Sequence, residues 1–488
     1  MDCPPCLLPF VSVLSLILIA VFLSVVIFWV DRQLKARRLP PGPRAESIPQ
    51  DPRGPWIAFE SLRQQYGSIF SFFRGTRPVI EKREIYSSRH EWSSRGMRGL
   101  SMPYGNTWRR WRKIHNIGMS GRASLTYRLH QTLESSLVLH GLLESPERYS
   151  YHIQRFATSV VLSITYGRRA TSLDDELVKQ NYRSILEFQR ANIPGRYLVE
   201  AWPILLLLPR PLQWFRHDFD RIRAQDTILY TTLLREVRQK MDAGTAKECI
   251  SSRSLDNGAD LGFSEVELAY AVSAPFGTGI DTTSGSVEVF LSGLQEGARG
   301  ARSCRRARPS FDDENALLYL GAFVKEVTRW RPIAPFVARA VTRDDTYEGY
   351  FIPKDTSVYG NTHAMMKGPE MLPEPEVFRP ERFFDTTEPR FTDFTLPFGF
   401  GRRVCPGMHV ALQSIYILVA RILWAFDVEP VRDEQGRAVL PDPDAFRFMG
   451  LSRVPEPFRF TLRPRTPDVV RIIDAETAEA EERLKEWG

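Results

Sequence analysis

The sequence predicts a mainly α-helical domain with small β-sheets, preceded by one N-terminal transmembrane helix. Long stretches repeat apolar residues at helical spacing, short turn-rich stretches alternate as strands do, and residues 7–30 carry no formal charge. The helical stretches are 107–119, 151–166, 173–190, 219–241, 264–294, 316–330 and 410–425, and the strand-like ones are 67–73, 346–352 and 447–462.

The composition of the 488 residues is that of a globular protein, with 43% hydrophobic and 25% charged residues. It excludes a disordered, collagen-like or disulfide-scaffold protein. The 65 Lys and Arg against 58 Asp and Glu give a net charge of +7 that is spread along the chain. An anionic membrane or an acidic partner is therefore favoured at least as much as nucleic acid. Five scattered cysteines indicate a reducing compartment.

Residues 1–30 are expected to be a membrane anchor. As a helix, residues 7–30 would extend ~36 Å, which exceeds the ~30 Å hydrocarbon core. Four basic residues follow within 32–38, whereas only Asp2 is charged before the run. The positive-inside rule then places residues 31–488 in the cytosol. A cleaved signal peptide fits less well, because the run is too long and no small-x-small site follows it.

The remaining chain divides into three segments. Residues 31–55 form a basic, proline-rich hinge, because the sequence Pro-Pro-Gly-Pro at 40–43 should be stiff and extended. Residues 56–470 are the expected catalytic domain. Residues 471–488 are a charged C-terminal tail, whose simplest form is a solvated surface helix.

Two segments inside the expected domain are ambiguous. Residues 201–209 are apolar but too short to span a bilayer, so they form either a buried connection or a loop that dips into the membrane interface. Residues 296–309 are rich in arginine and have almost no apolar periodicity. They form either a solvated basic loop or a damaged part of the gene model.

The strongest chemical signal lies at residues 398–407, Phe-Gly-Phe-Gly-Arg-Arg-Val-Cys-Pro-Gly. The glycines permit a tight loop whose amides can point at one sulfur. Arg403 would place a cation beside it, and a helix from Met408 would add the positive end of its dipole. These features stabilise a thiolate at Cys405, which suits a haem iron. The alternative is a buried structural cysteine, which is the interpretation for Cys249 and Cys304.

The pattern formed by Phe398, Gly401, Arg403, Cys405 and Gly407 resembles the haem-ligand signature of the cytochrome P450 monooxygenases, in particular the fungal microsomal, secondary-metabolism type. The resemblance runs from the anchor to about residue 465. It implies a cytochrome P450 fold and heme b, iron protoporphyrin IX, with the Cys405 thiolate as axial ligand.

Two further motifs resemble parts of the same family. Glu326 and Arg329 form an E-x-x-R pair on a predicted helix, and Arg382 belongs to a P-E-R-F sequence. In the family these residues form a buried Glu–Arg–Arg network behind the haem. Such a network must be satisfied as a whole or it costs stability.

Residues 278–283, Thr-Gly-Ile-Asp-Thr-Thr, resemble the oxygen-activation motif of the family, with Thr278 in place of the usual Ala or Gly. Gly279 would let substrate and dioxygen approach the helix backbone, and Asp281 with Thr282 would relay protons. A nucleotide-binding loop is excluded, because the third glycine is absent and no strand precedes. A plain helix with threonine back-bonding stays open.

Propionate contacts are implied by a W-x-x-x-R element, Trp108 to Arg112, and by Arg339, which stands where relatives often carry a histidine. The neighbouring basic residues of the element form either a solvated face or a docking face for an acidic reductase. The stretch from Thr282 to Glu326 is shorter than the family leads one to expect.

The resemblance implies insertion of one oxygen atom from O2 into a small hydrophobic substrate, such as a fungal terpenoid or polyketide. Electrons would come from NADPH through NADPH-cytochrome P450 reductase, with cytochrome b5 as a second candidate donor, at the endoplasmic reticulum membrane. Two alternatives stay open: a non-oxidative haem-thiolate isomerase or dehydratase, which the Asp281–Thr282 pair disfavours, and a defective paralogue, which the 296–309 segment allows.

Overall fold

The helical stretches form one packed body in the larger of two structural units. The computed structural model describes residues 38–43, 51, 53–74, 77–79, 94, 96–100, 102–191, 196–200, 203–257, 261–295, 308–354, 356–369, 371–384, 386–450 and 452–487, together with a few single residues between 15 and 30. The larger unit comprises residues 51–57, 85–337 and 360–488, and the smaller unit comprises residues 1–50, 58–84 and 338–359.

The helices of the larger unit are α4 (Asn106–Met119), α5 (Gly121–Ser124), α6 (Arg128–Glu144), α7 (Tyr149–Tyr166), α8 (Glu176–Ala191), α9 (His217–Asp242), α10 (Ile250–Asp256), α12 (Glu265–Val272), α13 (Ala274–Gln295), α14 (Leu318–Trp330), α15 (Thr362–Met365), α16 (Pro389–Thr392), α17 (Met408–Ala425) and α18 (Pro467–Leu484). Its strands β7 (Phe426–Arg432), β8 (Ala438–Val439) and β11 (Phe460–Pro464) form an antiparallel sheet in the order β11-β7-β8. The strands β9 (Phe446–Phe448) and β10 (Arg453–Pro455) form an antiparallel pair.

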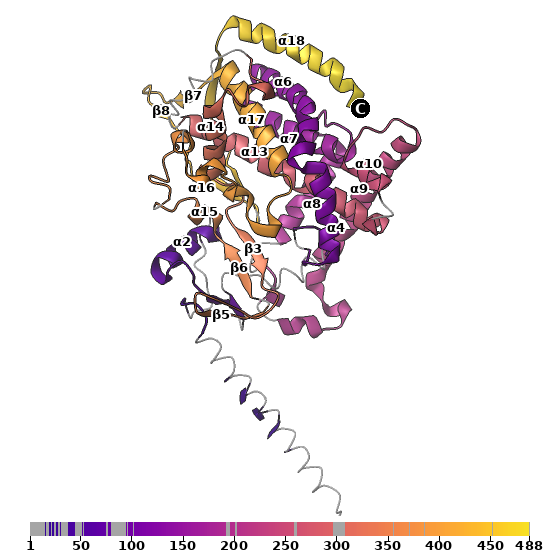
Figure 1. Ribbon diagram of the computed structural model, residues 1–488, viewed down its shortest axis with the longest axis vertical. Helices are drawn as coiled ribbons and strands as arrows, with labels where there is room; N and C mark the ends of the chain where they lie inside the picture. Colours follow the sequence, from indigo (N-terminus) through magenta and orange to yellow (C-terminus); the bar gives the residue numbers. More distant parts are fainter. Residues whose placement is uncertain are drawn as a thin grey trace, which may run out of the picture. The chain divides into compact units, whose positions relative to one another are not determined.

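The core of the larger unit is built around α13 and α17. Helix α13 packs against α7, α17 and α14, and α17 packs against α6 as well (Figure 1). Among the described residues, α17 is the one helix long and apolar enough to cross a bilayer, but 78% of it is buried inside the protein. It is therefore a core helix, and it carries the loop with Cys405 at its N-terminus.

Local sequence explains several helix ends. Helix α12 begins with a capping box in which the Ser264 and Glu267 side chains each accept from the other's backbone N–H. Helix α7 ends at Gly167, which adopts the left-handed conformation at φ 64°. The single helix predicted over 264–294 is instead two helices that meet at Ser273. Pro275 has no N–H to continue the α12 hydrogen-bond ladder, which accounts for the break.

Helix α6 was not among the predicted stretches. It packs against α7, α17 and α18, so several of its faces are covered and no single apolar stripe marks it. Its buried positions include polar residues such as Gln131 and Glu134. Tertiary packing, rather than amphipathic periodicity, defines this helix.

The C-terminal tail is more than the solvated helix expected from its charge. Helix α18 lies along α6 and buries Val469, Ile473, Ala480 and Leu484 (Figure 1). Its Glu476 is buried and accepts from Arg421 of α17 at 2.9 Å. The tail therefore belongs to the packed body.

The smaller unit contains most of α2 (Pro55–Tyr66), the hairpin β1 (Phe72–Arg74) and β2 (Arg77–Val79), and the hairpin β4 (Asp345–Tyr347) and β5 (Tyr350–Ile352). The strands β3 (Val337–Ala340) and β6 (Ser357–Gly360) form another pair. A small apolar cluster of Phe59, Leu62, Phe70 and Phe72 packs inside this unit.

The Pro-Pro-Gly-Pro segment lies in the smaller unit and is neither helix nor strand. The Ser71 hydroxyl donates to the Pro40 carbonyl oxygen at 2.6 Å, and the Ser71 N–H donates to the Pro41 carbonyl oxygen at 2.8 Å. A Cβ on Gly42 would come within 1.6 Å of the Ser71 carbonyl oxygen, so only glycine fits there. The transmembrane helix predicted for residues 7–30 lies largely outside the described residues and stays a prediction.

Candidate active site

A glycine-rich loop, residues 398–407, holds Cys405 just before α17. Gly399 and Gly401 adopt left-handed backbone conformations, at φ 74° and 65°, which other residues rarely adopt. The Cys405 N–H donates to the Phe398 carbonyl oxygen at 3.0 Å and closes the loop. At Gly407 a Cβ would stand 3.9 Å from the Cys405 Sγ, which is an ordinary van der Waals contact, so Gly407 lies directly beside the sulfur.

The Cys405 side chain is exposed, although protein atoms surround the loop on which it lies. Burial by those atoms raises the pKa of the thiol above its ordinary value, and the Gly407 N–H and the charge of Arg112 oppose the rise. A backbone amide and an arginine therefore favour the thiolate, as the sequence led us to expect, while burial opposes it. A bound metal would have to displace the proton.

The cation near the sulfur is Arg112 of α4, not Arg403 as the sequence suggested. The Arg112 Nη1 donates to the carbonyl oxygen of Val404, the residue before Cys405, at 2.5 Å. Arg403 instead donates to the Gly99 and Met102 carbonyl oxygens at 3.2 and 2.6 Å. The loop turns at Gly401, and the backbone acceptors available to Arg403 come from the segment before α4.

Trp108 and the two arginines fit a haem. Trp108 is buried, and the Arg403 guanidinium lies 4.5 Å from the centre of the Trp108 ring. The indole Nε1–H of Trp108 has no acceptor among the described residues. A buried donor without a partner costs about 1–3 kcal/mol, so its retention indicates a ligand that accepts from it. Haem propionates are such acceptors, guanidinium groups bind carboxylates, and an accessible cysteine sulfur can ligate the iron.

Arg339, the remaining propionate candidate, lies on β3 and belongs to the smaller unit. It is half-buried, and burial lowers the pKa of its guanidinium.

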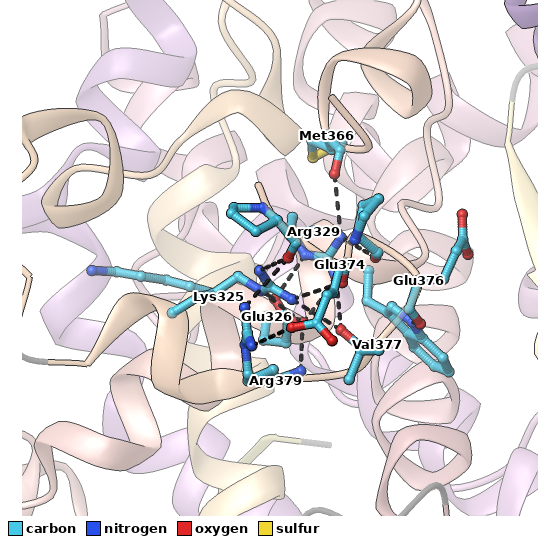
Figure 2. A network of polar contacts seen from close by, with 12 residues as sticks. Lys325, Glu326, Arg329, Met366, Glu374, Glu376, Val377 and Arg379 are labelled. Carbon is cyan, nitrogen blue, oxygen red and sulfur yellow. Dashed lines mark hydrogen bonds and ion pairs between the residues drawn. The ribbon is translucent and has the colours of Figure 1, made fainter. Parts of the chain in front are cut away.

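The E-x-x-R and P-E-R-F motifs meet in one buried network. Figure 2 shows Glu326 and Arg329 at its centre. The Arg329 Nε and Nη2 donate to the two carboxylate oxygens of Glu326, each at 2.7 Å, and both side chains are completely buried. The Arg382 Nε lies 3.2 Å from the Glu326 Oε2. The Arg379 N–H adds a fourth donor at 2.7 Å.

The same network ties distant backbone to α14. The Arg329 Nη1 donates to the Pro375 carbonyl oxygen at 2.7 Å and to the Met366 carbonyl oxygen at 3.2 Å (Figure 2). The Arg382 Nη1 donates to the Pro373 carbonyl oxygen at 2.9 Å. One carboxylate thus fixes two arginines that hold residues 366–377, so the network is structural.

Helix α13 carries the predicted acid and alcohol. The Thr282 hydroxyl donates to the Thr278 carbonyl oxygen at 2.9 Å, which is the back-bonding expected of a plain helix. Asp281 is different, because burial raises the pKa of its carboxyl group while a hydrogen bond from the Gln189 side chain and the charge of Arg447 oppose the rise. Neither Gln189 nor Arg447 has a local sequence signal, since they reach Asp281 from α8 and β9.

Gly279 has a packing role in helix α13. A Cβ at this position would come within 2.7 Å of the Val161 Cγ1 of α7, so glycine lets α13 and α7 approach closely. Gly279 is itself partly exposed, and the expectation that it lets substrate and dioxygen approach the helix backbone stays a prediction. Thr278, the residue that departs from the family pattern, is exposed.

The accessible cysteine in a glycine-rich loop, the unpaired indole N–H and the buried Glu–Arg–Arg network define a haem-thiolate type of site. The family model for Cytochrome P450 matches residues 40–462, and the chain belongs to this family. Members of the family use haem with a cysteine thiolate ligand.

Curated relatives agree with the family. The chain is 33% identical to cytochrome P450 monooxygenase 58 of Postia placenta, over 89% of this chain and 90% of the relative. It is 30% identical to cytochrome P450 monooxygenase aneD of Aspergillus aculeatus, over 92% of both chains. It is 29% identical to cytochrome P450 monooxygenase polD of Polytolypa hystricis, over 90% and 92%. The protein is therefore an oxidoreductase of the monooxygenase type.

Proposed function

We propose that this monooxygenase inserts one oxygen atom from O2 into a small hydrophobic fungal metabolite, such as a terpenoid or polyketide, with Cys405 as the axial ligand of heme b. The observation that carries the proposal is the accessible Cys405 beside Arg112 and the unpaired Trp108 N–H. The test is expression with a reductase, followed by comparison of metabolites in the producing strain with and without the gene. A product that depends on NADPH and O2 supports the proposal, and gene-dependent conversion without either would favour the isomerase or dehydratase.

The bound haem would supply oxygen activation, and the protein supplies its ligand, its orientation and protons. Trp108, Arg112 and Arg403 would hold the propionates. Asp281 would be the acid of the pair, because burial raises the pKa of its carboxyl group while Gln189 and Arg447 oppose the rise. Rotation of the Thr282 hydroxyl away from the Thr278 carbonyl oxygen would let it pass a proton toward the site.

Replacing Asp281 with asparagine is expected to lower NADPH-driven product formation by about 100-fold, because the amide cannot deliver a proton. The reduced, carbon-monoxide-treated spectrum should stay unchanged, since the residue does not hold the haem. Ser286→Ala is the control. It removes a polar side chain of the same helix, whose hydroxyl donates to the Thr282 carbonyl oxygen as the Thr282 hydroxyl does to Thr278. Equal product yields from Asp281→Asn and the parent would contradict the assignment.

The electron donor proposed is NADPH-cytochrome P450 reductase, with cytochrome b5 as a second candidate. Helix α4 presents Arg109 and Lys113 on its exposed side, beside an open hollow that Trp108, Arg112, Asn116 and Ile117 also line. Positive charge over the proposed haem site is complementary to an acidic flavoprotein surface. Reconstitution with either protein, at increasing salt, tests the choice.

The proposed location is the endoplasmic reticulum membrane, with one anchor and a cytosolic body. Besides the charge pattern of residues 1–38, the 203–216 segment supports membrane contact. Its apolar side chains Leu207, Leu212 and Trp214 are 81%, 59% and 53% exposed, whereas Phe215 is buried. This arrangement favours a loop that dips into the interface over a buried connection.

Removing residues 1–30 is expected to convert an integral membrane protein into one that high salt or carbonate releases. The exposed apolar loop would keep weak, reversible membrane contact, because a few apolar side chains bind far less strongly than a spanning helix. Fractionation of tagged proteins measures the change. Release of the full-length protein by carbonate would contradict an integral anchor.

The two alternative functions, a non-oxidative isomerase or dehydratase and a defective paralogue, are distinguished by the carbon-monoxide spectrum together with NADPH consumption. The segment 296–307, which raised the possibility of a defective paralogue, lies outside the described residues. A defective protein would give no band at about 450 nm after reduction and carbon monoxide, whereas an isomerase would give the band without consuming NADPH.

A further inference from the structure

Glu288 differs from the other buried acids of the described chain. Glu134, Asp226, Glu326 and Glu476 each accept from an arginine at 2.5–2.9 Å. Glu288 is only 5% exposed, but no ion pair joins it to a described residue, and its partner is the Ser150 hydroxyl, 2.6 Å from its Oε1. A carboxyl group buried with a neutral partner favours its protonated form.

Glu288 lies two helical turns after Asp281 on α13. The groups that act on it electrostatically are Asp281 and, from β9, Arg447, and the pKa of Tyr149 of α7 responds to it in turn. Burial and the charge of Asp281 raise the pKa of Glu288 to about 7, while Ser150 and Arg447 oppose the rise. Burial raises the pKa of Tyr182, and the same two carboxyl groups add to the rise.

Two of the groups that interact electrostatically with these acids reach the surface. Tyr182 of α8 is 37% exposed, and Arg447 is exposed, while Gln189, about two helical turns further along α8, is buried and bonds Asp281. The two acids are thus coupled electrostatically to side chains that reach the surface. The helical rise between residues 281 and 288 is ~10 Å, so a proton would pass through intervening hydroxyl groups or solvent molecules.

We propose that Glu288 is a positioning residue that stores a proton and resupplies Asp281 during turnover. The proton leaves the Glu288 carboxyl group, the Asp281 carboxylate takes it up, and solvent at the Tyr182 and Arg447 side reprotonates Glu288. No electron moves in this step. The inference deepens the proposed function, because it assigns the supply of protons to the Asp281–Thr282 pair.

The test uses the holoenzyme with its reductase and no added substrate, where NADPH and O2 yield hydrogen peroxide and consume protons. Glu288→Gln keeps an oxygen that accepts from Ser150 but cannot hold a proton. We expect NADPH consumption at pH 6 to fall by about 10-fold and the titration near pH 7 to disappear. Glu288→Asp should restore part of both. Glu265→Gln, an exposed residue of α12 paired with Arg235, is the matched control.

A stability measurement tests the same residue without turnover. Its folded pKa lies above the ordinary value of 4.5, so the folded state keeps a proton that the unfolded chain releases between about pH 4.5 and 7. Stability that depends on this proton is therefore lost as the pH rises through 7. The Tm of Glu288→Gln relative to the parent should rise by on the order of 2 °C between pH 5.5 and 8.

The outcomes separate the two proposals. A parent enzyme without the band at about 450 nm overturns the proposed function, whatever the Tm values show. A competent parent whose pH profile Glu288→Gln leaves unchanged overturns the proton store alone. A pH-independent Tm difference also overturns it, because it would show a merely structural role for Glu288.

Discussion

Cys405→Ser is expected to abolish the band at about 450 nm and to reduce NADPH-driven oxygenation below detection, at least 100-fold. Serine preserves the size of the side chain and the N–H bond to the Phe398 carbonyl oxygen, so the loop should keep its shape. A serine hydroxyl does not give up its proton as a thiol does, and it cannot push electron density onto iron in the same way. The change therefore isolates the sulfur from the fold.

Cys249→Ser is the matched control for this experiment. Cys249 is buried at the start of α10, where its Sγ accepts from the Ser252 N–H at 3.4 Å. Serine is a favourable residue at such an N-cap, so stability should be kept. Both the spectrum and the activity should match the parent. A Cys405→Ser protein with a normal carbon-monoxide spectrum would exclude Cys405 as the ligand.

Glu326→Ala is expected to prevent haem incorporation and to yield little folded protein. The substitution leaves Arg329, completely buried, without its carboxylate, and it removes the partner of Arg382 as well. Leaving a buried charge uncompensated costs about 3–5 kcal/mol, which is a large share of the stability of a typical domain. The Soret absorbance per mole of protein and the soluble yield measure the loss.

Glu381→Ala is the control for Glu326→Ala. It tests whether the haem is lost because Glu326 belongs to the buried network, or whether loss of any nearby acidic residue has the same effect. Glu381 neighbours Arg382 but is exposed and accepts from the Tyr319 hydroxyl at 2.7 Å. An exposed contact of this kind contributes about 0–1 kcal/mol, so the haem content should stay near that of the parent. Full Soret absorbance in Glu326→Ala would show that the network is dispensable.

Much of the fold was predictable because the apolar pattern of most helices lies within a short stretch of sequence. The helices α4, α7, α8, α9, α14 and α17 lie within a few residues of the predicted stretches, since each buries one face or is apolar throughout. The missed helix α6 and the packed tail α18 depend on neighbours from remote parts of the chain. The burial of these two helices depends on contacts between residues that lie far apart in the sequence, so a short stretch of sequence does not reveal it.

The candidate site also has features that local sequence predicted and features that depend on long-range contacts. The sequence brought Glu326, Arg329 and Arg382 into one hypothesis, and the structure places them together. It did not indicate that the missing side chain of Gly279 accommodates Val161 of α7. From the sequence we expected Arg403 beside the sulfur, whereas Arg112 acts on it. The direction of the Arg403 side chain depends on its backbone acceptors at Gly99 and Met102, which are distant in the sequence.

What the sequence determined by itself is which reactive groups are present: one cysteine in a glycine-rich loop, an acid–alcohol pair on a helix, and an apolar stretch with basic residues after it. These follow from residue types at short spacing, and short-range geometry is set by the backbone. Only the tertiary structure decided which charges meet, that Arg112 approaches the sulfur, that Gln189 bonds Asp281 and that Glu288 is buried with a hydroxyl. Burial and long-range contact set the protonation of a group, because both depend on atoms from distant segments.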